Sequence, residues 1–276
     1  MKLRRLLTAL LGVGLLASCG GGGSGPQISS MQIAGARFAG TATITLSGIR
    51  LDEGVTLSVN GPCQTLTTVT GGTTETRQYT CDVTDLGDIV AVARNGLGAQ
   101  IGQVSATVPT PRVDVTTSLG SFTIELHAQQ APKTVRNFLG YTRAGFYDAV
   151  LVHWAQPDRG IMSGGYRTGL RVKAPTAAAI ELESSNGLKN LRGSVAMFRD
   201  AEPNSARARW FVNTADNADL DFVDEASPGY AVFGTVIGGL AVVDAISAVP
   251  TRADETTGLP FVPVTEVLVT DITQTR

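Results

Sequence analysis

The chain has few of the residues that most often carry chemistry. Its 276 residues include two histidines, three cysteines and two tryptophans. His127 ends the run FTIELH with no second histidine or thiol beside it, so we interpret it as a solvated strand end and not as a metal ligand. No serine stands in a nucleophile-elbow pattern, and the paired glycines do not form a phosphate-binding pattern after a strand. These absences argue against a hydrolase.

The charge pattern argues against further kinds of partner. The formal net charge is −2, and no block of basic residues is present, so nucleic acid is a poor candidate. Asp216, Asp219, Asp221 and Asp224 are spaced somewhat like the ligands of a calcium loop, but the segment lacks the glycine and the closing glutamate of such a loop. We therefore expect no metal, no cofactor and no nucleic acid.

The chain also lacks long apolar runs. The longest, LLTALLGVGLLA, follows the basic start MKLRR; at roughly a dozen residues it is too short for a bilayer span of ~20 and is typical of a secretory signal. The ending LASC resembles a bacterial lipobox, so we predict a signal over residues 1–19 and a lipid on Cys19, which attaches the protein to a membrane surface and not through it. The alternative is a plain signal peptide with an incidental cysteine.

The residues after this cysteine predict an exported protein. Residues 20–26, GGGGSGP, read as a flexible tether. Gly20, in place of an aspartate, resembles the sorting pattern of outer-membrane lipoproteins, so we expect a cell-envelope lipoprotein on the outer membrane, facing the periplasm. In that oxidising compartment Cys63 and Cys81 are expected to form a disulfide, because two thiols alone lack the further ligands that a metal needs.

Residues 27–110 have the pattern of short β-strands. Runs such as TATITLSGI and RQYTCDV are rich in Val, Ile and Thr, several alternate apolar and polar residues, and two Asn-Gly pairs supply turns. This predicts a small β-sandwich, and TITLSGIRLDEGVTLSVNG resembles an immunoglobulin-like module of the IPT/TIG kind. The segment has no cluster of chemistry-bearing residues, so we interpret it as a spacer or a binding module. Pro109 and Pro111 interrupt the strand pattern and mark the boundary to a second domain.

The second domain, residues 111–276, combines many strands with two helices. APKTVRNFLGYTRAG predicts a helix with Pro132 in its first turn and Gly145 at its end, and GGLAVVDAISAV predicts another. The runs VLVHWA, GSVAMF, WFVNT, YAVFGTV and EVLVTDI read as strands. Many strands with only two helices favour a closed antiparallel barrel whose ends the helices cover.

Five runs in this half carry a family resemblance: VTTSLGSFTIELHAQQAPKTVRNFLGY, GFYDAVLVHW, NGLKNLRGSVAM, EPNSARARWFVN and GYAVFGTVIGGLAVVDAI. In their order and approximate spacing, from about Val113 to the C-terminus, the chain resembles the cyclophilin family of peptidyl-prolyl cis-trans isomerases. The resemblance implies a mainly β fold, an eight-stranded antiparallel barrel capped by two α-helices. It also implies proline-containing polypeptides as clients and a reaction that requires no cofactor.

The resemblance points to one unusual position. Family members have Phe-His-Arg where this chain has Val152-His153-Trp154, so His153 matches the family's histidine and Trp154 stands in place of its arginine. In the family that arginine donates a hydrogen bond toward the prolyl nitrogen. An indole N–H is also a donor, but it lacks the fixed charge and the forked geometry of a guanidinium group. The resemblance therefore implies an isomerase of reduced activity.

Further departures fall around the same position. The family's Phe-Met-x-Gln-Gly-Gly run matches residues 160–165 after an apparent one-residue insertion, and its Gln-Phe-Phe run matches residues 209–211. Where the family often has an aromatic residue, the chain has Asp219. The substrate-binding residues that this matching implies are Ile161, Ser163, Phe198, Phe211, Leu220 and Tyr230. Because the departures concentrate on the active face, they favour a reshaped or retired site.

Two arginines are candidates to replace the missing cation. Arg209 stands at the family's glutamine position, and Arg159 lies in the lengthened loop; the alternative is that both are solvated surface residues. The candidate catalytic residues are thus His153, Trp154 and Arg209. Three functions stay open: a weakened isomerase for envelope proteins, a non-catalytic module that binds proline-containing segments, and a structural envelope protein.

Overall fold

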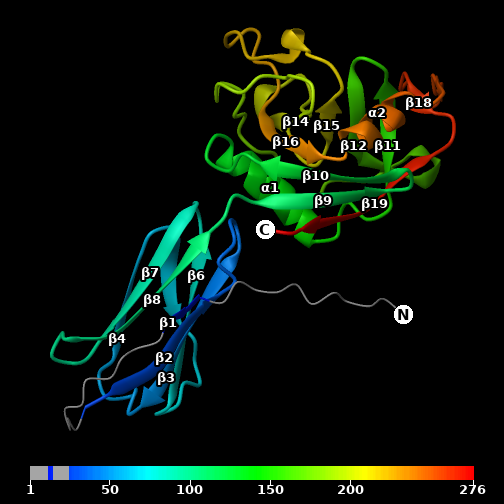
Figure 1. Ribbon diagram of the computed structural model, residues 1–276. Helices are drawn as coiled ribbons and strands as arrows, with labels where there is room; N and C mark the ends of the chain where they lie inside the picture. Colours follow the sequence, from blue (N-terminus) through cyan, green and yellow to red (C-terminus); the bar gives the residue numbers. More distant parts are fainter. Residues whose placement is uncertain (1–11, 15–24) are drawn as a thin grey trace, which may run out of the picture. The chain divides into compact units, whose positions relative to one another are not determined.

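The computed structural model describes residues 12–14 and 25–276. The predicted lipidation site at Cys19, most of the predicted signal and most of the predicted tether lie outside the described residues. The chain divides into two compact units, the first ending at Pro109 and the second beginning at Thr110 (Figure 1). No helix in the described part of the chain combines the length and the apolar character needed to cross a bilayer.

The first unit consists of antiparallel strands. They are β1 (Gly12–Gly14), β2 (Gln27–Ala34), β3 (Thr41–Ile49), β4 (Thr56–Asn60), β5 (Cys63–Thr68), β6 (Thr76–Val83), β7 (Gly87–Arg94) and β8 (Gln100–Val108). In the described residues they form one sheet in the order β1-β2-β3-β6-β5 and another in the order β4-β7-β8. Strand β1, within the predicted signal, pairs with the edge of β2.

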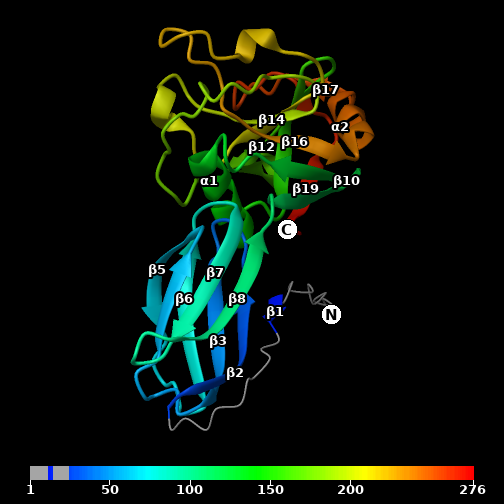
Figure 2. The same ribbon diagram turned by 60° about the vertical axis from the view of Figure 1, so that its left-hand side comes forward.

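The two sheets of this unit share an apolar core. In β3, Ala42, Ile44 and Leu46 are fully buried and alternate with more exposed residues, as expected for a sheet with one covered face. A Cβ atom added to Gly102 in β8 would lie 2.7 Å from the Sδ atom of Met31 in β2. The sheets therefore approach closely at that point, and the unit is a two-layered β structure (Figure 2).

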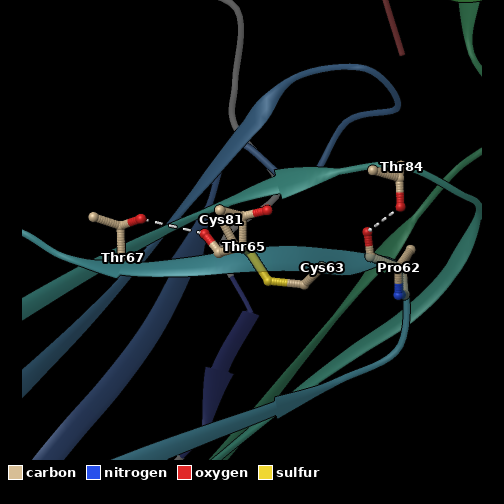
Figure 3. Close-up of a disulfide and its surroundings, with 6 residues drawn as sticks. All are labelled: Pro62, Cys63, Thr65, Thr67, Cys81 and Thr84. Atoms are coloured by element: carbon tan, nitrogen blue, oxygen red, sulfur yellow. Dashed lines mark hydrogen bonds between the residues drawn. A yellow bond between two sulfur atoms is a disulfide. The ribbon is translucent and has the colours of Figure 1, made fainter.

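A disulfide joins Cys63 to Cys81, with their Cα atoms 5.5 Å apart, which confirms the predicted pairing. It links the neighbouring strands β5 and β6 (Figure 3). The backbone N–H of Thr84 donates to the carbonyl of Pro62 at 2.8 Å, so a backbone hydrogen bond next to the bridge also holds the start of β5. Closing a loop of this size contributes about 3 kcal/mol in the chain-entropy model.

The second unit is a closed barrel. Its strands are β9 (Arg112–Thr117), β10 (Gly120–Leu126), β11 (Val150–Gln156), β12 (Gly160–Arg167), β13 (Arg171–Val172), β14 (Ser194–Met197), β15 (Trp210–Asn213), β16 (Val232–Gly238), β17 (Thr251–Arg252), β18 (Val262–Pro263) and β19 (Val267–Gln274). In this fully described unit, eight strands follow the order β11-β19-β9-β10-β16-β14-β15-β12, and a β11–β12 pairing closes the ring. All of these pairings are antiparallel. The predicted eight-stranded barrel is confirmed.

Two α-helices accompany the barrel within residues 110–276, as predicted: α1 (Pro132–Arg143) and α2 (Leu240–Ser247). Pro132 begins α1, where its missing N–H costs nothing, and Gly145 follows its end with a φ of 63°. Short 3₁₀ turns are η1 (Thr168–Leu170), η2 (Pro203–Ser205) and η3 (Ala218–Leu220). Helix α1 buries Phe138, whose ring centroid lies 6.0 Å from that of Trp210 and 5.1 Å from that of Phe233, so the helix is fixed to the barrel interior.

Candidate active site

One row of side chains crosses five neighbouring strands of the barrel. Met162 in β12 pairs with Trp154 in β11 and with Phe211 in β15. Phe211 pairs with Ala196 in β14, which pairs with Val232 in β16. Directly paired residues point to the same side of a sheet, so these five side chains share one face. Strands β12, β14 and β16 of this row are labelled in Figure 2.

This face carries an apolar cluster that remains partly open. Ala196, Phe211 and Val232 are buried, and five partly buried side chains pack against them; the full set, which we name the apolar cradle, is Ala196, Phe211, Val232, Met162, Leu188, Phe198, Leu220 and Tyr230. The ring of Tyr230 stacks on Phe198 with centroids 5.9 Å apart and meets Phe211 edge-on at 5.5 Å. Partly exposed aromatic and aliphatic groups of this kind form a surface that fits a small apolar ring.

Two of the predicted pocket residues, Ile161 and Ser163, do not face the cradle. Ile161 is 1% exposed and pairs with the buried Val212. Ser163 is equally buried, and its hydroxyl donates to the carbonyl of Leu151 at 2.9 Å. Both therefore point into the barrel, and Met162 and Gly164 take the outward positions, because side chains alternate along a strand. The structure therefore places Met162, and not Ile161 or Ser163, on the side of the cradle.

The other four predicted pocket residues, Phe198, Phe211, Leu220 and Tyr230, all belong to the cradle. Trp154 lies at the β11 end of the row, half-buried, opposite Met162. Its indole meets the ring of Phe261 edge-on, with centroids 6.3 Å apart. Phe261 comes from the segment before β18, and its carbonyl accepts the backbone N–H of Ala155 at 3.0 Å. Trp154, which the family resemblance puts at the arginine position, thus packs against a second aromatic ring.

His153 is the extra residue of a bulge in β11, where the pairing shifts between Val152 and Trp154. The side chain is 1% exposed, and its ring lies 4.8 Å from that of Tyr166. Burial, and then repulsion from the charge of Arg209, lowers the pKa of His153 to about 4, although a hydrogen bond with the Leu151 backbone opposes the shift. The imidazole is therefore neutral near pH 7 and lies beneath the surface, where it does not supply a cation.

Arg209 extends along the outward face. It precedes Phe211 by two residues, and a Cβ atom on Gly165 would lie 3.0 Å from its Cδ atom, so the glycine leaves room for the long side chain. The guanidinium carbon lies 4.2 Å from the centroid of Phe198, in the range of a cation–π contact, and the group is ion-paired with the exposed Asp200. Arg209 thus brings a positive charge to the rim of the cradle.

Arg159 brings a second cation to the rim. It donates to Oδ1 of Asp219 at 2.8 Å and to Oδ1 of Asn217 at 3.1 Å. The hydrogen bond with Asp219 raises the pKa of Arg159 and lowers that of Asp219. Asp219 precedes the cradle residue Leu220 in η3. Each rim cation is therefore already paired with an exposed carboxylate.

The four aspartates that were compared with a calcium loop have separate partners. Asp216 accepts the backbone N–H of Arg192, Asp221 accepts that of Asn190, and Asp224 accepts those of its own turn, while Asp219 binds Arg159. Within residues 12–14 and 25–276, no three metal-binding side chains of His, Cys, Asp or Glu converge.

The sequence interpretation missed four residues at the site. Met162 pairs directly with Phe211 across β12 and β15, so it would have been found if the outward side of β12 had been assigned from the residue opposite Phe211. Leu188 and Asp200 come from irregular segments, whose side-chain directions no periodicity predicts. Arg199 is a third cation at the rim; it lies 5.2 Å from the centroid of Tyr230 and donates to the carbonyl of Gly229 at 2.8 Å.

Comparison with known proteins identifies the second unit. The model of the cyclophilin-type peptidyl-prolyl cis-trans isomerase family matches residues 112–269. The chain belongs to this family. Residues 110–276 are accordingly a cyclophilin-type isomerase domain, and the barrel, the cradle and the substituted arginine position are features of a family member.

Individual relatives agree with this assignment. A peptidyl-prolyl cis-trans isomerase of Acinetobacter baylyi is 41% identical over 162 residues, which span 59% of this chain and 83% of the relative. One of Streptomyces antibioticus is 42% identical over 159 residues, spanning 57% and 94%. A solved cyclophilin-type isomerase of Cryptosporidium parvum, crystallised in the presence of the dipeptide Ala-Pro, has a TM-score of 0.50 at 24% identity over 58% of this chain and 96% of its own; this similarity concerns the fold.

Proposed function

We propose that the cyclophilin-type domain isomerises Xaa-Pro bonds at the apolar cradle, at a reduced rate, in proteins of the cell envelope. Rotation about the amide C–N bond meets a barrier of ~18–20 kcal/mol, because the bond has partial double-bond character. The two isomers of an Xaa-Pro bond differ by only about 1 kcal/mol. The enzyme therefore needs to stabilise the twisted state, in which the nitrogen is no longer conjugated.

The single observation that carries the proposal is the row from Trp154 through Met162 to Phe211. The apolar cradle is present and partly open, so it offers a surface for a proline ring. The residue at its β11 end is a tryptophan, whose neutral N–H stabilises the twisted nitrogen less than a guanidinium group would. One candidate replacement is Arg209, which rests on the cradle residue Phe198. In a related protein, crystallisation with Ala-Pro supports a proline-containing ligand.

Isomerase assays on a proline-containing tetrapeptide test this proposal. We expect Trp154→Arg to raise kcat/KM by about tenfold or more, because one correctly placed hydrogen-bond donor contributes on the order of 10²-fold in other enzymes. Trp154→Lys is the matched control, which supplies a positive charge without the forked geometry of a guanidinium group. Trp154→Phe keeps an aromatic ring but removes the indole N–H donor. The double variant Arg159→Ala/Arg209→Ala should lose most of the remaining activity. Brisk turnover by this double variant would contradict the proposal.

The second candidate function is binding without turnover, and the pairing of Arg159 and Arg209 with carboxylates favours it. Titration of a proline-containing peptide, followed by Trp154 fluorescence, distinguishes the two. Binding with no catalysed isomerisation in any variant except Trp154→Arg would establish the binding module. If the protein neither catalyses isomerisation nor binds the peptide, a structural role remains.

We further propose export and lipidation on Cys19, with the domain held near the periplasmic face of the outer membrane. The Cys63–Cys81 disulfide supports an oxidising compartment. The first unit would then be an IPT/TIG-like spacer or binding module between the tether and the isomerase domain. Radiolabelled palmitate incorporation in the wild type, and its loss in Cys19→Ala, tests the lipid.

A further inference from the structure

A cavity of about 360 Å³ adjoins the apolar cradle on the side of Arg209. Phe198, a cradle residue, and Arg209, which rests on it, both line this cavity, so the cavity and the cradle are contiguous at Phe198. The other walls come from the outward side of β12, including Gly164 and Gly165, and from the segments around Lys173 and Arg207. Because the two glycines have no side chains, the cavity floor there is backbone.

The charges around this cavity are unequal. Lys173, Arg207 and Arg209 line it, against one carboxylate, Asp200, which is paired with Arg209. Among the described residues Lys173 and Arg207 form no salt bridge within 4.0 Å. The cavity therefore carries a local excess of positive charge in a chain whose formal net charge is −2.

Both cations are held in place by carbonyl groups and retain further donors. The ammonium group of Lys173 donates to the carbonyl of Phe146 and, at 3.4 Å, to that of Asp148, which uses two of its three N–H groups. One N–H of Arg207 donates to the carbonyl of Ala177 at 3.3 Å, out of the five that a guanidinium offers. The pKa of Lys173 is lowered by burial and then by repulsion from Arg167, while Asp148 opposes the shift.

We propose that this cavity binds a carboxylate side chain of the client, so that the preferred clients are segments with an Asp or Glu close to the proline. The proposal rests on the function proposed above, because it assumes that the proline occupies the cradle. A glutamate fits the volume, and its oxygens accept from ammonium and guanidinium groups. Lys173 is half-buried, so its attraction to a client carboxylate is screened less than that of the exposed Arg207.

The test uses the full chain and four peptides with acetylated and amidated ends, so that the terminal groups carry no charge. Two peptides have Glu or Gln two residues before the proline, and two have Glu or Gln two residues after it. We expect the Glu peptide to bind about five- to tenfold more tightly than its Gln partner in at least one placement, by calorimetry at low ionic strength. The preference should shrink as salt is added.

Variants assign the preference to the cavity. Lys173→Met and Arg207→Gln should each lower the Glu-to-Gln affinity ratio toward one, while Asp200→Asn should raise it, because it removes the carboxylate of the lining. Arg94→Gln in β7 is the matched control: it removes an equal charge from the first unit and should leave the ratio unchanged.

The outcomes separate this inference from the function on which it rests. Equal binding of Glu and Gln peptides in both placements, or a preference that survives both Lys173→Met and Arg207→Gln, overturns the inference and leaves isomerisation or proline binding intact. Failure of all four peptides to bind overturns both.

Discussion

Trp210 and Phe211 are neighbours on β15 but lie on opposite sides of the barrel wall. Trp210 is 1% exposed and meets Phe138 and Tyr147 edge-on inside the barrel, whereas Phe211 faces outward and forms the floor of the cradle. The same holds on β12 for Ile161, which points inward, and Met162, which points outward. The inward residues Trp210 and Ile161 are apolar and closely packed, as the barrel interior requires. Two of the departures from the family pattern that the sequence indicated, Trp154 and Arg209, lie on the outward side.

This difference shows how one fold accommodates a changed site. Replacing an inward residue leaves a cavity or causes a clash, so the fold limits what can stand there. An outward residue beside an open surface has fewer packing partners, and its identity follows from what the surface binds. A cyclophilin barrel can therefore exchange an arginine for a tryptophan and a glutamine for an arginine without changing its strand order.

Substitutions at the neighbours Ile161 and Met162 should have the largest effects, and they test which residues of β12 face the barrel interior and which face the cradle. Ile161→Ala should cost about 2–5 kcal/mol of unfolding free energy, because it leaves a cavity in the core, and Ile161→Val should cost only about 0.5–1.5 kcal/mol. Met162→Ala should cost less than Ile161→Ala but weaken peptide binding. Denaturant unfolding and peptide titration of the same variants check both. If Met162→Ala lost more stability than Ile161→Ala, Met162 would be the inward residue and Ile161 the outward one, as the sequence predicted.

His153, in the bulge between the two faces, gives the next largest effect. Its pKa is lowered from 6.5 to about 4 in the folded chain, so the folded state binds fewer protons than the unfolded state as the pH falls below 6.5. Stability from this group is complete above pH 6.5 and decreases down to about pH 4. From these two pKa values, wild type should lose about 2 kcal/mol between pH 8 and pH 5 relative to His153→Gln. Parallel pH profiles for the two proteins would mean that the ring is solvated.

The rim pair of Arg159 and Asp219 gives the smallest effect. Asp219→Asn should change stability by less than about 1 kcal/mol, since the pair is substantially exposed. The freed guanidinium then has access to the cradle, and we expect kcat/KM to rise by about two- to threefold, which is the range of a weak exposed interaction. The rise should disappear in Asp219→Asn/Arg159→Gln. A rise that persists in this double variant would assign the effect to the new amide side chain and exclude Arg159.

The sequence predicted the barrel, both helices and the disulfide, because each depends on a local pattern or on a count of cysteines. Four of the predicted pocket residues, Phe198, Phe211, Leu220 and Tyr230, lie together in the cradle. Ile161 and Ser163 lie inside the barrel instead, because side chains alternate along β12 and the pairing with β15 sets which of them face outward. The ion pairs of Arg159 and Arg209 could not be predicted either, since Asp219 and Asp200 lie in irregular segments whose geometry depends on the whole fold.

Strand β5 buries few side chains, so the Cys63–Cys81 disulfide is the main interaction that holds it against β6. Five of its six residues are exposed, and its pairing with β6 is irregular between Gln64 and Thr67. Little apolar surface therefore holds the strand in place, and cleavage of the Cys63–Cys81 bridge would let it fray. The unpaired backbone of β6 would then become a template for strands of other chains, so the redox state of this one bond would govern the tendency of the protein to self-associate.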